Sequence, residues 1–262
     1  MKKYWYRFLS AIQSEFQYRT NLFAWMIVGA IGPTIMVFVW SAILEQQPSV
    51  GGYDQSDFIL YYLLTTVGWY IVGGEFARPV GTAIRSGDIN KSLLQPYSVI
   101  LGKAVWEQAW KLLSLILSLP VCVLILYLTR DTLEFSFNLS TLPVLLVSLI
   151  GGALIFGMLQ AIIGILAFWM SEVWPIAEMN DMLLHLLGGM LAPMTLLPTM
   201  VQTISLYLPF RYIFFEPVAI ALGKQTDPFG VIFKQAIFIV LLYAVYKVLW
   251  RAGLRKYEGT GG

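Results

Sequence analysis

The stretch RPVGTAIRSGDINKSLLQP (residues 78–96) is a polar island between two long apolar runs. The run before it covers residues 58–74, and the run after it covers residues 105–128. Apolar runs of about 20 residues are long enough to cross the hydrocarbon core of a bilayer as helices. The island therefore marks a place where the chain leaves the membrane between two spans.

The composition excludes an ordinary soluble domain. The 262 residues are 58% hydrophobic and 12% charged, with a mean hydropathy of +0.72. Soluble domains carry about 25% charged residues, so half of the usual solvating surface is missing. A membrane β-barrel would show alternating segments of about ten residues, whereas these runs are continuous. We therefore predict an all-α, polytopic membrane protein.

Several function classes are disfavoured by what the chain lacks. Its net charge of +2 is not pooled into one basic patch, so no nucleic-acid partner is expected. Cys122 is the one cysteine and His185 the one histidine, so neither a disulfide framework nor a thiolate metal site is expected. The chain has no Gly-x-x-x-x-Gly-Lys-Ser/Thr phosphate loop. We expect no cofactor, no metal and no enzyme activity in this chain alone.

The order of apolar runs predicts two parts. Residues 1–19 form an amphipathic helix, basic on one face and aromatic on the other, which suits a helix lying in the membrane interface. Residues 20–262 form a transmembrane domain. Its six spans are expected over residues 22–44, 58–74, 105–128, 142–170, 182–197 and 229–250. Prolines break the region of about residues 198–224, which we predict to re-enter the membrane before the last span.

Lysine and arginine are distributed unevenly between the two sides of this topology. With the N-terminus inside, most of them are cytoplasmic, and only Arg130, Arg211 and Lys224 are outside. This bias follows the positive-inside rule and places both termini in the cytoplasm. The acidic segment 171–181 also falls inside, but acidic residues count little in this rule. We predict a multi-pass protein of the cytoplasmic (inner) membrane of a bacterium or cyanobacterium.

The polar island has the signature of two short helices with a break between them. Pro79 suits the first turn of a helix, and Gly87 suits a left-handed cap that ends it. After this break Ile89, Leu93 and Leu94 form an apolar stripe. Such an element suits docking into a groove on a soluble partner. The alternative is an ordinary connecting loop with an interfacial helix.

Two charged groups near predicted spans are candidate sites. Glu107 and Lys111 are four residues apart and can pair on one helix face, which favours a structural pair over a proton relay. Glu178, Asp181 and His185 also share a helix face. A metal site there would need further ligands, so a solvated start of a helix is the favoured interpretation.

Small residues recur four apart in the fourth predicted span, at Ala153, Gly157 and Ala161. This spacing allows close approach of a second helix. Packing within the chain and contact with another subunit explain it equally well.

Three features together resemble the permease subunit of ABC-2 type ABC transporters. They are the interfacial N-terminal helix, the stretch 84–96 with its Arg-x-Gly-Asp-Ile and Leu-Leu-x-Pro elements, and the Leu-Pro-Phe-Arg-Tyr segment that begins at residue 208. The resemblance covers the whole chain in order. It is nearest to the subfamily whose permeases act beside a second, related permease and a separate ATPase.

This resemblance implies a division of labour between subunits. The implied ATPase partner is a P-loop dimer that uses ATP and Mg²⁺. The permease itself spans the membrane lipid. It pairs with a second, related permease in a heterodimer, which is the favoured alternative, or with a second copy of itself in a homodimer. A coupling region over residues 78–96 would seat on the ATPase. The coupling residues implied are Ile84, Arg85, Gly87, Asp88, Leu93 and Leu94. The extracellular gate residues implied are Pro209, Phe210 and Pro217.

The expected function is therefore that of an exporter subunit for an amphipathic or hydrophobic substrate, such as a drug, a toxic compound, a lipid-linked molecule or a peptide. One alternative is an ATP-independent carrier or channel, which would carry paired carboxylates or a polar ring deep in its spans. Another is a membrane-embedded enzyme that uses Glu178, Asp181 and His185.

Overall fold

A computed structural model describes residues 2–17, 19–95, 98–133 and 139–257, and these form helices joined by short links. The longer helices are α1 (Lys2–Gln17), α2 (Arg19–Leu44), α3 (Gln55–Val72), α6 (Val99–Leu128), α7 (Leu142–Ile165), α8 (Trp174–Leu187) and α11 (Pro228–Lys256). The shorter ones are α4 (Ala77–Arg85), α5 (Ile89–Leu93), α9 (Thr199–Ser205), α10 (Phe215–Ala221) and the 3₁₀ turns η1 (Arg130–Thr132), η2 (Leu139–Thr141), η3 (Leu166–Phe168), η4 (Met194–Leu196) and η5 (Phe210–Tyr212). The all-α prediction is confirmed.

Within the described residues, three helical segments are long and apolar enough to cross a membrane: α6, α7 continued by η3, and α11. A fourth candidate is the broken pair formed by α9 and the segment Phe210–Ala221, which meet at 78°. Helices α2 and α3 pack on α6 and on each other. The membrane fold is thus established, and the count of six spans stays a prediction.

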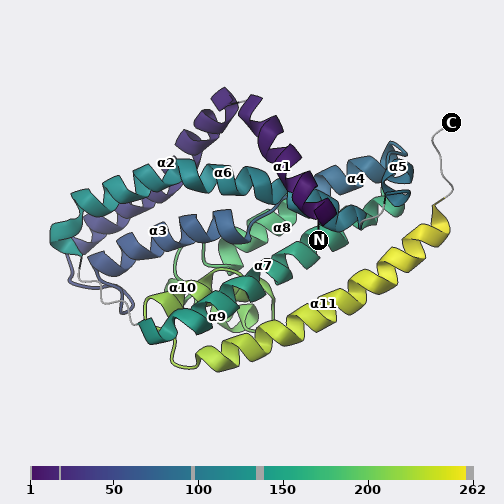
Figure 1. The fold of residues 1–262 in the computed structure, drawn as a ribbon. Helices are drawn as coiled ribbons and strands as arrows, with labels where there is room; N and C mark the ends of the chain where they lie inside the picture. The colour runs from purple at the N-terminus through teal and green to yellow at the C-terminus, as the bar shows by residue number, and fades with distance from the viewer. Residues whose placement is uncertain (1, 18, 96–97, 134–138, 258–262) are drawn as a thin grey trace.

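The helices form a bundle with two distinct ends (Figure 1). Helices α4 and α5 lie at one end, beside the start of α6 and towards the end of α11. Helices α9 and α10 lie towards the other end, near the starts of α7 and α11. We call these the α4–α5 end and the α9–α10 end. The polar island and the proline-rich region are therefore separated along the bundle.

The predicted N-terminal helix is present as α1, which packs along α6. Its Arg7 Nε atom donates a hydrogen bond to the Gly102 carbonyl oxygen at 2.6 Å, and the Tyr4 hydroxyl accepts one from the Ser98 amide at 3.1 Å. Trp5 on this helix is exposed. The helix thus fastens one polar face to the start of α6 and keeps aromatic groups at its surface, as an interfacial helix requires.

The predicted bounds of the fifth span are wrong. No helix covers residues 182–197: α8 begins at Trp174 and ends at Leu187. Gly189 follows with a φ of +80°, and a Cβ there would lie 2.6 Å from the Tyr61 hydroxyl, so the chain turns at a position that only glycine suits. With 14 residues, α8 is about 21 Å long, which is shorter than a bilayer core of about 30 Å.

Candidate functional site

The polar island folds as the predicted pair of helices, α4 and α5, with Gly87 between them. Pro79 lies in the first turn of α4, and Gly87 has a φ of +78°. A residue with a Cβ would be strained in this left-handed conformation. Ile84 and Ile89 on either side of the break are buried. The break therefore turns the chain at a fixed point on the bundle. Pro96, which closes the island, lies outside the described residues.

Helix α4 is held closely against α7 and the link before α8. A Cβ at Gly164 of α7 would lie 2.8 Å from the Val80 Cβ atom, and one at Gly81 would lie 2.5 Å from the Val173 Cγ2 atom. Val80 is completely buried at this crossing. The amide of Ala77 also donates to the Gln160 side chain of α7 at 3.0 Å. Because packed interiors do not compress, a displacement of α4 would move α7 with it.

Two ion pairs join α4 to an acidic segment that consists of the link before α8 and the first turns of α8. Arg78 pairs with Glu178, and Arg85 pairs with Glu172. The Arg85 Nη1 atom also donates to the Ser171 carbonyl oxygen at 2.7 Å. Sequence reasoning missed both pairs because the partners are 100 and 87 residues apart. They extend the candidate site from the island to α8.

The outer part of α5 presents apolar side chains to the surroundings. Leu93 is 43% exposed and Leu94 is 89% exposed, whereas Ile89 of the same predicted stripe is completely buried. Beside them the Asp88 carboxylate accepts hydrogen bonds from Lys91 at 3.0 Å and from the Ser86 hydroxyl at 2.9 Å. These two hydrogen bonds hold the pKa of Asp88 below its ordinary value. The site thus offers two leucines beside a fixed negative charge.

The residues implied as a gate lie in and around η5 and α10, towards the α9–α10 end. Pro209 precedes η5, Phe210 begins it, and Pro217 lies in α10, with Phe210 and Pro217 both buried. Sequence reasoning missed the charges between them: the Arg211 Nε atom lies 2.5 Å from the Glu216 Oε1 atom. The sequence did contain a signal for this ion pair, because an arginine and a glutamate stand five residues apart in an otherwise apolar segment.

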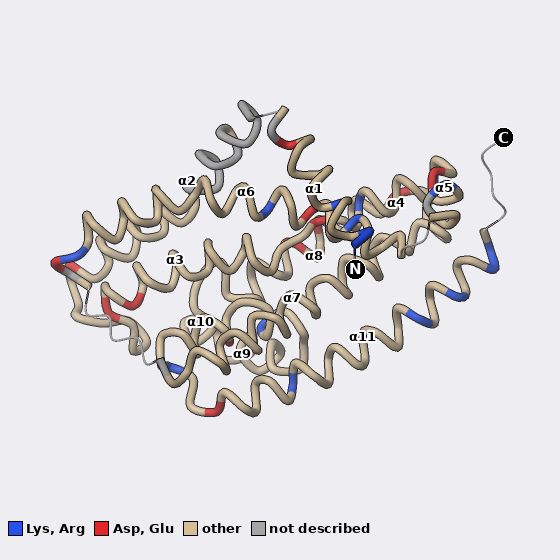
Figure 2. The backbone as a smooth tube through the Cα atoms, viewed as in Figure 1, with Lys and Arg blue, Asp and Glu red and all other residues tan. Residues whose placement is uncertain are grey.

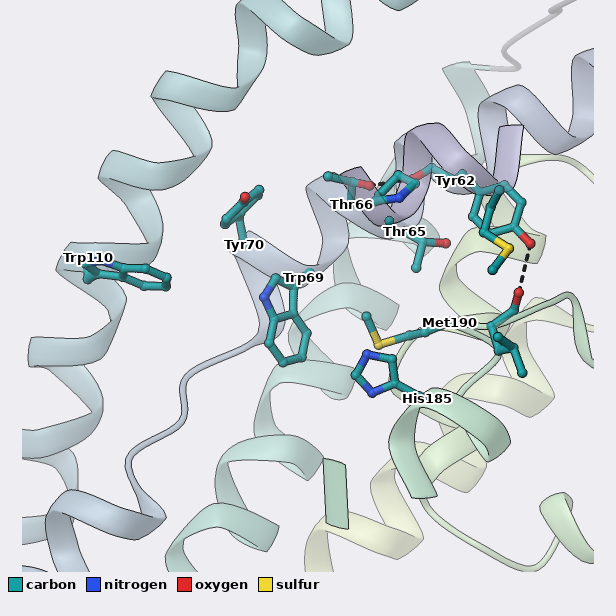
Figure 3. A pocket seen from close by; sticks show the side chains of 12 residues that line it. Tyr62, Thr65, Thr66, Trp69, Tyr70, Trp110, His185 and Met190 are labelled. Atoms are coloured by element: carbon teal, nitrogen blue, oxygen red, sulfur yellow. Dashed lines mark hydrogen bonds between the residues drawn. The ribbon is translucent and has the colours of Figure 1, made fainter. Parts of the chain in front are cut away.

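A cavity of about 380 Å³ lies between α2, α3, α6 and α8, and it was not predicted. Figure 3 shows Trp69, Met190 and His185 grouped around it, with Trp110 approaching from α6. Its lining brings residues from four helices and one link together, so no local pattern in the sequence could reveal it. Its walls are mainly aromatic and apolar.

The model of the ABC-2 family transporter protein matches residues 30–261, which include both ends of the bundle, the island and the cavity. The chain belongs to this family. No match to a curated protein was found. As an ABC-2 permease, the protein is a membrane transport component, and permeases of this family work with an ATPase. The resemblance carried by the island and the Leu-Pro-Phe-Arg-Tyr segment is thereby confirmed at the level of the family.

The small residues of α7 in this ABC-2 permease face space within the chain. Ala153, Gly157 and Ala161 line a cavity of about 500 Å³ between α6, α7 and α11, and a Cβ at Gly157 would meet no atom within 4 Å. The close approaches of α7 occur instead at three other glycines: Gly164 against Val80 of α4, Gly151 against Gln235 of α11, and Gly152 against the Ile213 carbonyl oxygen. Contact with another subunit stays a prediction for the stripe.

The side chains of the alternative metal or enzyme site do not converge on a common point in the hydrogen bonds of the permease. Glu178 pairs with Arg78, and the Asp181 carboxylate accepts a hydrogen bond from Asn180 at 3.3 Å. The His185 Nδ1 atom lies 2.8 Å from the Asp181 backbone carbonyl oxygen. Among the described residues, no group of three or more histidine, cysteine, aspartate or glutamate side chains is arranged to hold a metal ion.

Lys111 is placed differently from the predicted pair with Glu107. Its Nζ atom lies 3.9 Å from the centre of the Trp69 ring and 5.1 Å from that of Trp110. Lys111 is only 2% exposed. Its main contact is therefore with the faces of two indoles, and both indoles line the aromatic cavity.

Proposed function

We propose that this ABC-2 permease is the membrane subunit of an ATP-driven exporter that moves an amphipathic or hydrophobic substrate out of the cytoplasm. A separate P-loop ATPase dimer docks at the α4–α5 end, where it hydrolyses ATP with Mg²⁺. The observation that carries the proposal is the structure of the island in a member of this family: α4 is locked to α7 and α8, while Leu93 and Leu94 of α5 stay exposed.

The mechanism follows from these contacts. Closure of the ATPase dimer pushes on α5, and the buried residues Ile84 and Ile89 transmit the displacement to α4. The Val80–Gly164 contact passes it to α7, and the Arg78–Glu178 ion pair passes it to α8. Such coupling needs contiguous packed elements with two arrangements, and the bundle supplies the contiguous packing.

The sidedness of the proposal rests on charge. The α4–α5 end carries Arg78, Arg85 and Lys91, and α11 ends in Arg255 and Lys256 near the same end (Figure 2). An excess of lysine and arginine marks the cytoplasmic side. This end therefore faces the cytoplasm of a bacterial cell, and Pro209, Phe210 and Pro217 act as the gate on the outer side. A second, related permease completes the pathway.

Copurification tests this proposal. Tagged permease is expected to bring down a P-loop ATPase, identified by mass spectrometry, from the cell that produces it. Leu94→Asp should abolish this association, because it places a charge on the docking surface. Leu128→Asp is the matched control, since Leu128 is also exposed but lies at the opposite end of α6. Transport that survives both Leu94→Asp and Arg85→Ala would instead favour an ATP-independent carrier or channel.

A further inference from the structure

The cavity between α6, α7 and α11 is open towards the surroundings of the bundle. Three of its lining residues are Leu101 of α6, Leu154 of α7 and Tyr243 of α11, which are 54%, 45% and 46% exposed. The volume of about 500 Å³ falls within the range of about 300 to 1,000 Å³ found for small-molecule pockets. These three helices belong to the segments long and apolar enough to cross the membrane, so a lipid can reach the cavity from the side.

This cavity extends along the bundle for about the depth of one membrane leaflet. On α6 its lining begins at Ser98, the N-cap residue of the helix, and continues to Gln108. A helix rises 1.5 Å per residue, so this part of α6 is about 15 Å long, half of a bilayer core of about 30 Å. The start of α6 lies at the α4–α5 end (Figure 1). The cavity therefore begins at that end and stops near the middle of the membrane.

The one charged residue that lines the cavity, Lys247 of α11, lies at the same end. A Cβ at Gly151 of α7 would meet Gln235 of α11, and a Cβ at Gly253 of α11 would meet Phe168 of η3. The continuous segment α7–η3 and α11 thus run side by side in the same direction. Since Lys247 lies between these two contacts, it is level with the last turns of α7, close to the α4–α5 end.

Lys247 is the first residue of a basic stripe on α11, which continues with Arg251 and Arg255 at four-residue spacing. Residues at this spacing share one face of a helix. All three side chains are exposed, and α11 contains no aspartate or glutamate. Among the described residues, no ion pair includes a member of the stripe, and the Lys247 Nζ atom lies 5.3 Å from the centre of the neutral Tyr243 ring. The stripe is therefore open to an anion from outside the chain.

The acidic residues nearest to the cavity lie away from the basic stripe. Glu75 and Glu107 adjoin the lining residues Gly74 and Gln108 in the sequence. A Cβ at Gly74 would lie 3.7 Å from the Glu107 Cβ atom and 3.9 Å from the Gln108 Nε2 atom, which places this acidic pair towards the inner end of the cavity. Glu172 is paired with α4 and lines a separate cavity. The mouth of the cavity at the α4–α5 end is therefore positive.

A positive mouth and an apolar interior one leaflet deep match the two parts of an anionic phospholipid. Basic pockets between transmembrane helices on the cytoplasmic side bind anionic lipid headgroups. An arginine guanidinium can hold a phosphate through two hydrogen bonds, and a lysine ammonium adds a mobile point charge. Long basic side chains near the end of a span also reach outward to the headgroup level.

We propose that the cavity and the basic stripe bind one anionic phospholipid of the cytoplasmic leaflet. One acyl chain lies between α6, α7 and α11, and the phosphate lies against Lys247 and Arg251. Such a lipid is a bound partner of the permease. Only the choice of leaflet rests on the proposed function, through its sidedness.

Lipid binding to the purified full-length permease in detergent tests this proposal without any ATPase. The probes are dioleoyl phosphatidylglycerol and dioleoyl phosphatidylcholine, which have the same chains but differ in headgroup charge. Native mass spectrometry is expected to show one phosphatidylglycerol bound at saturation, about tenfold more tightly than phosphatidylcholine. Similar affinities for the two lipids would overturn the proposal. Glycerol 3-phosphate should not bind, and saturable binding of it would instead indicate a site for free phosphate.

A charge variant tests the headgroup contact at exposed positions, where misfolding is not expected. Lys247→Gln/Arg251→Gln should weaken phosphatidylglycerol binding by about tenfold, to the affinity for phosphatidylcholine. Arg130→Gln/Lys234→Gln is the matched control, because it removes the same charge from two exposed residues at the other end of the bundle. An equal loss in both double variants would overturn the proposal, since only the overall charge would then matter.

A second variant tests the place of the acyl chain. Gly157→Leu fills the cavity, and it should weaken the binding of both lipids by about tenfold at unchanged thermal stability. Gly32→Leu on α2 is the control, because a Cβ at Gly32 also meets no atom within 4 Å. Unchanged binding in a folded Gly157→Leu variant would overturn the assignment of the chain to this cavity.

The lipid site and the proposed function can fail separately. Leu94→Asp should keep the preference for phosphatidylglycerol while losing ATPase association. A wild-type permease that binds the ATPase but shows no preference between the two lipids would overturn the lipid site and leave the proposed function standing.

Discussion

The guanidinium of Arg211 and the carboxylate of Glu216 form a buried ion pair, with Nε and Oε1 2.5 Å apart. Gln225 donates to the other oxygen of Glu216, and the Arg211 Nη1 atom lies 3.4 Å from the Ser205 hydroxyl. The guanidinium also lies over the Phe215 ring at 4.9 Å. This network ties together α9, η5, α10 and the link to α11.

Removing one partner of this pair should destabilise the protein strongly. Glu216→Gln leaves the Arg211 charge buried without its counter-ion, and such a change costs about 3 kcal/mol. Thermal unfolding in detergent, followed by intrinsic fluorescence, measures the loss. The exposed pair Arg130–Asp131 supplies the control, because Asp131→Asn should change stability by no more than about 0.5 kcal/mol. Equal melting temperatures for the two variants would contradict the prediction.

Local chemistry in the sequence was sufficient to predict the two-helix island. Pro79 and Gly87 act through backbone geometry, which depends on neighbouring residues alone, and both occupy the predicted positions. The spans over residues 105–128 and 229–250 were recognisable for the same reason, because helices α6 and α11 cover them. Uninterrupted apolar runs of this length have few alternatives to a helix.

The features that could not be predicted from the sequence are those that depend on contacts between distant parts of the chain. Helix α8, which lies where the fifth span was predicted to begin, ends at Leu187 because the chain turns at Gly189 beside Tyr61, a residue 128 positions away. Lys111 turns to Trp69 of another helix, although Glu107 of its own helix was the expected partner. Periodicity reports which residues share a face of one helix, but it does not show which face of a neighbour they will meet.

Gly87 and Gly157 should respond differently to the same substitution. Gly87→Ala places a Cβ on a residue with a φ of +78°, which should cost about 1 kcal/mol of stability and should weaken coupling by shifting α5. Gly157→Ala adds a methyl group to open space in a helix, so it should be neutral or stabilising by up to about 1 kcal/mol. Thermal unfolding of both variants, with substrate-dependent ATPase activity of the reconstituted complex, checks this contrast.

Ile89 and Leu94 should separate folding from docking. Ile89 is completely buried, so Ile89→Ala should cost about 2 to 4 kcal/mol in unfolding free energy. Leu94→Ala, at an 89% exposed position, should change stability by less than about 0.5 kcal/mol and still weaken ATPase binding. Unfolding curves and the affinity for the ATPase provide the two readouts. A Leu94 variant that lowers the melting temperature as much as the Ile89 variant would show that α5 is packed.

Tyr53, in the link between α2 and α3, should make stability fall at high pH. Its ring lies edge-on to Tyr61, with centroids 6.1 Å apart, and the Lys224 Nζ atom lies 4.7 Å from its centre. Burial is the main cause that raises the pKa of Tyr53 to about 12. In the unfolded chain the phenol ionises near pH 10. Between these values the folded state holds the proton that the unfolded state has released, so rising pH favours unfolding.

The size of this effect follows from linkage. Between about pH 10 and 12, Tyr53 should lower the free energy of unfolding by up to about 1.4 kcal/mol per pH unit. Chemical unfolding of wild type and Tyr53→Phe across this range measures the difference between their slopes. Tyr127→Phe is the control, because Tyr127 is exposed near the end of α6. If wild type and Tyr53→Phe lost stability equally from pH 10 to 12, the phenol of Tyr53 would not be the group whose burial opposes ionisation.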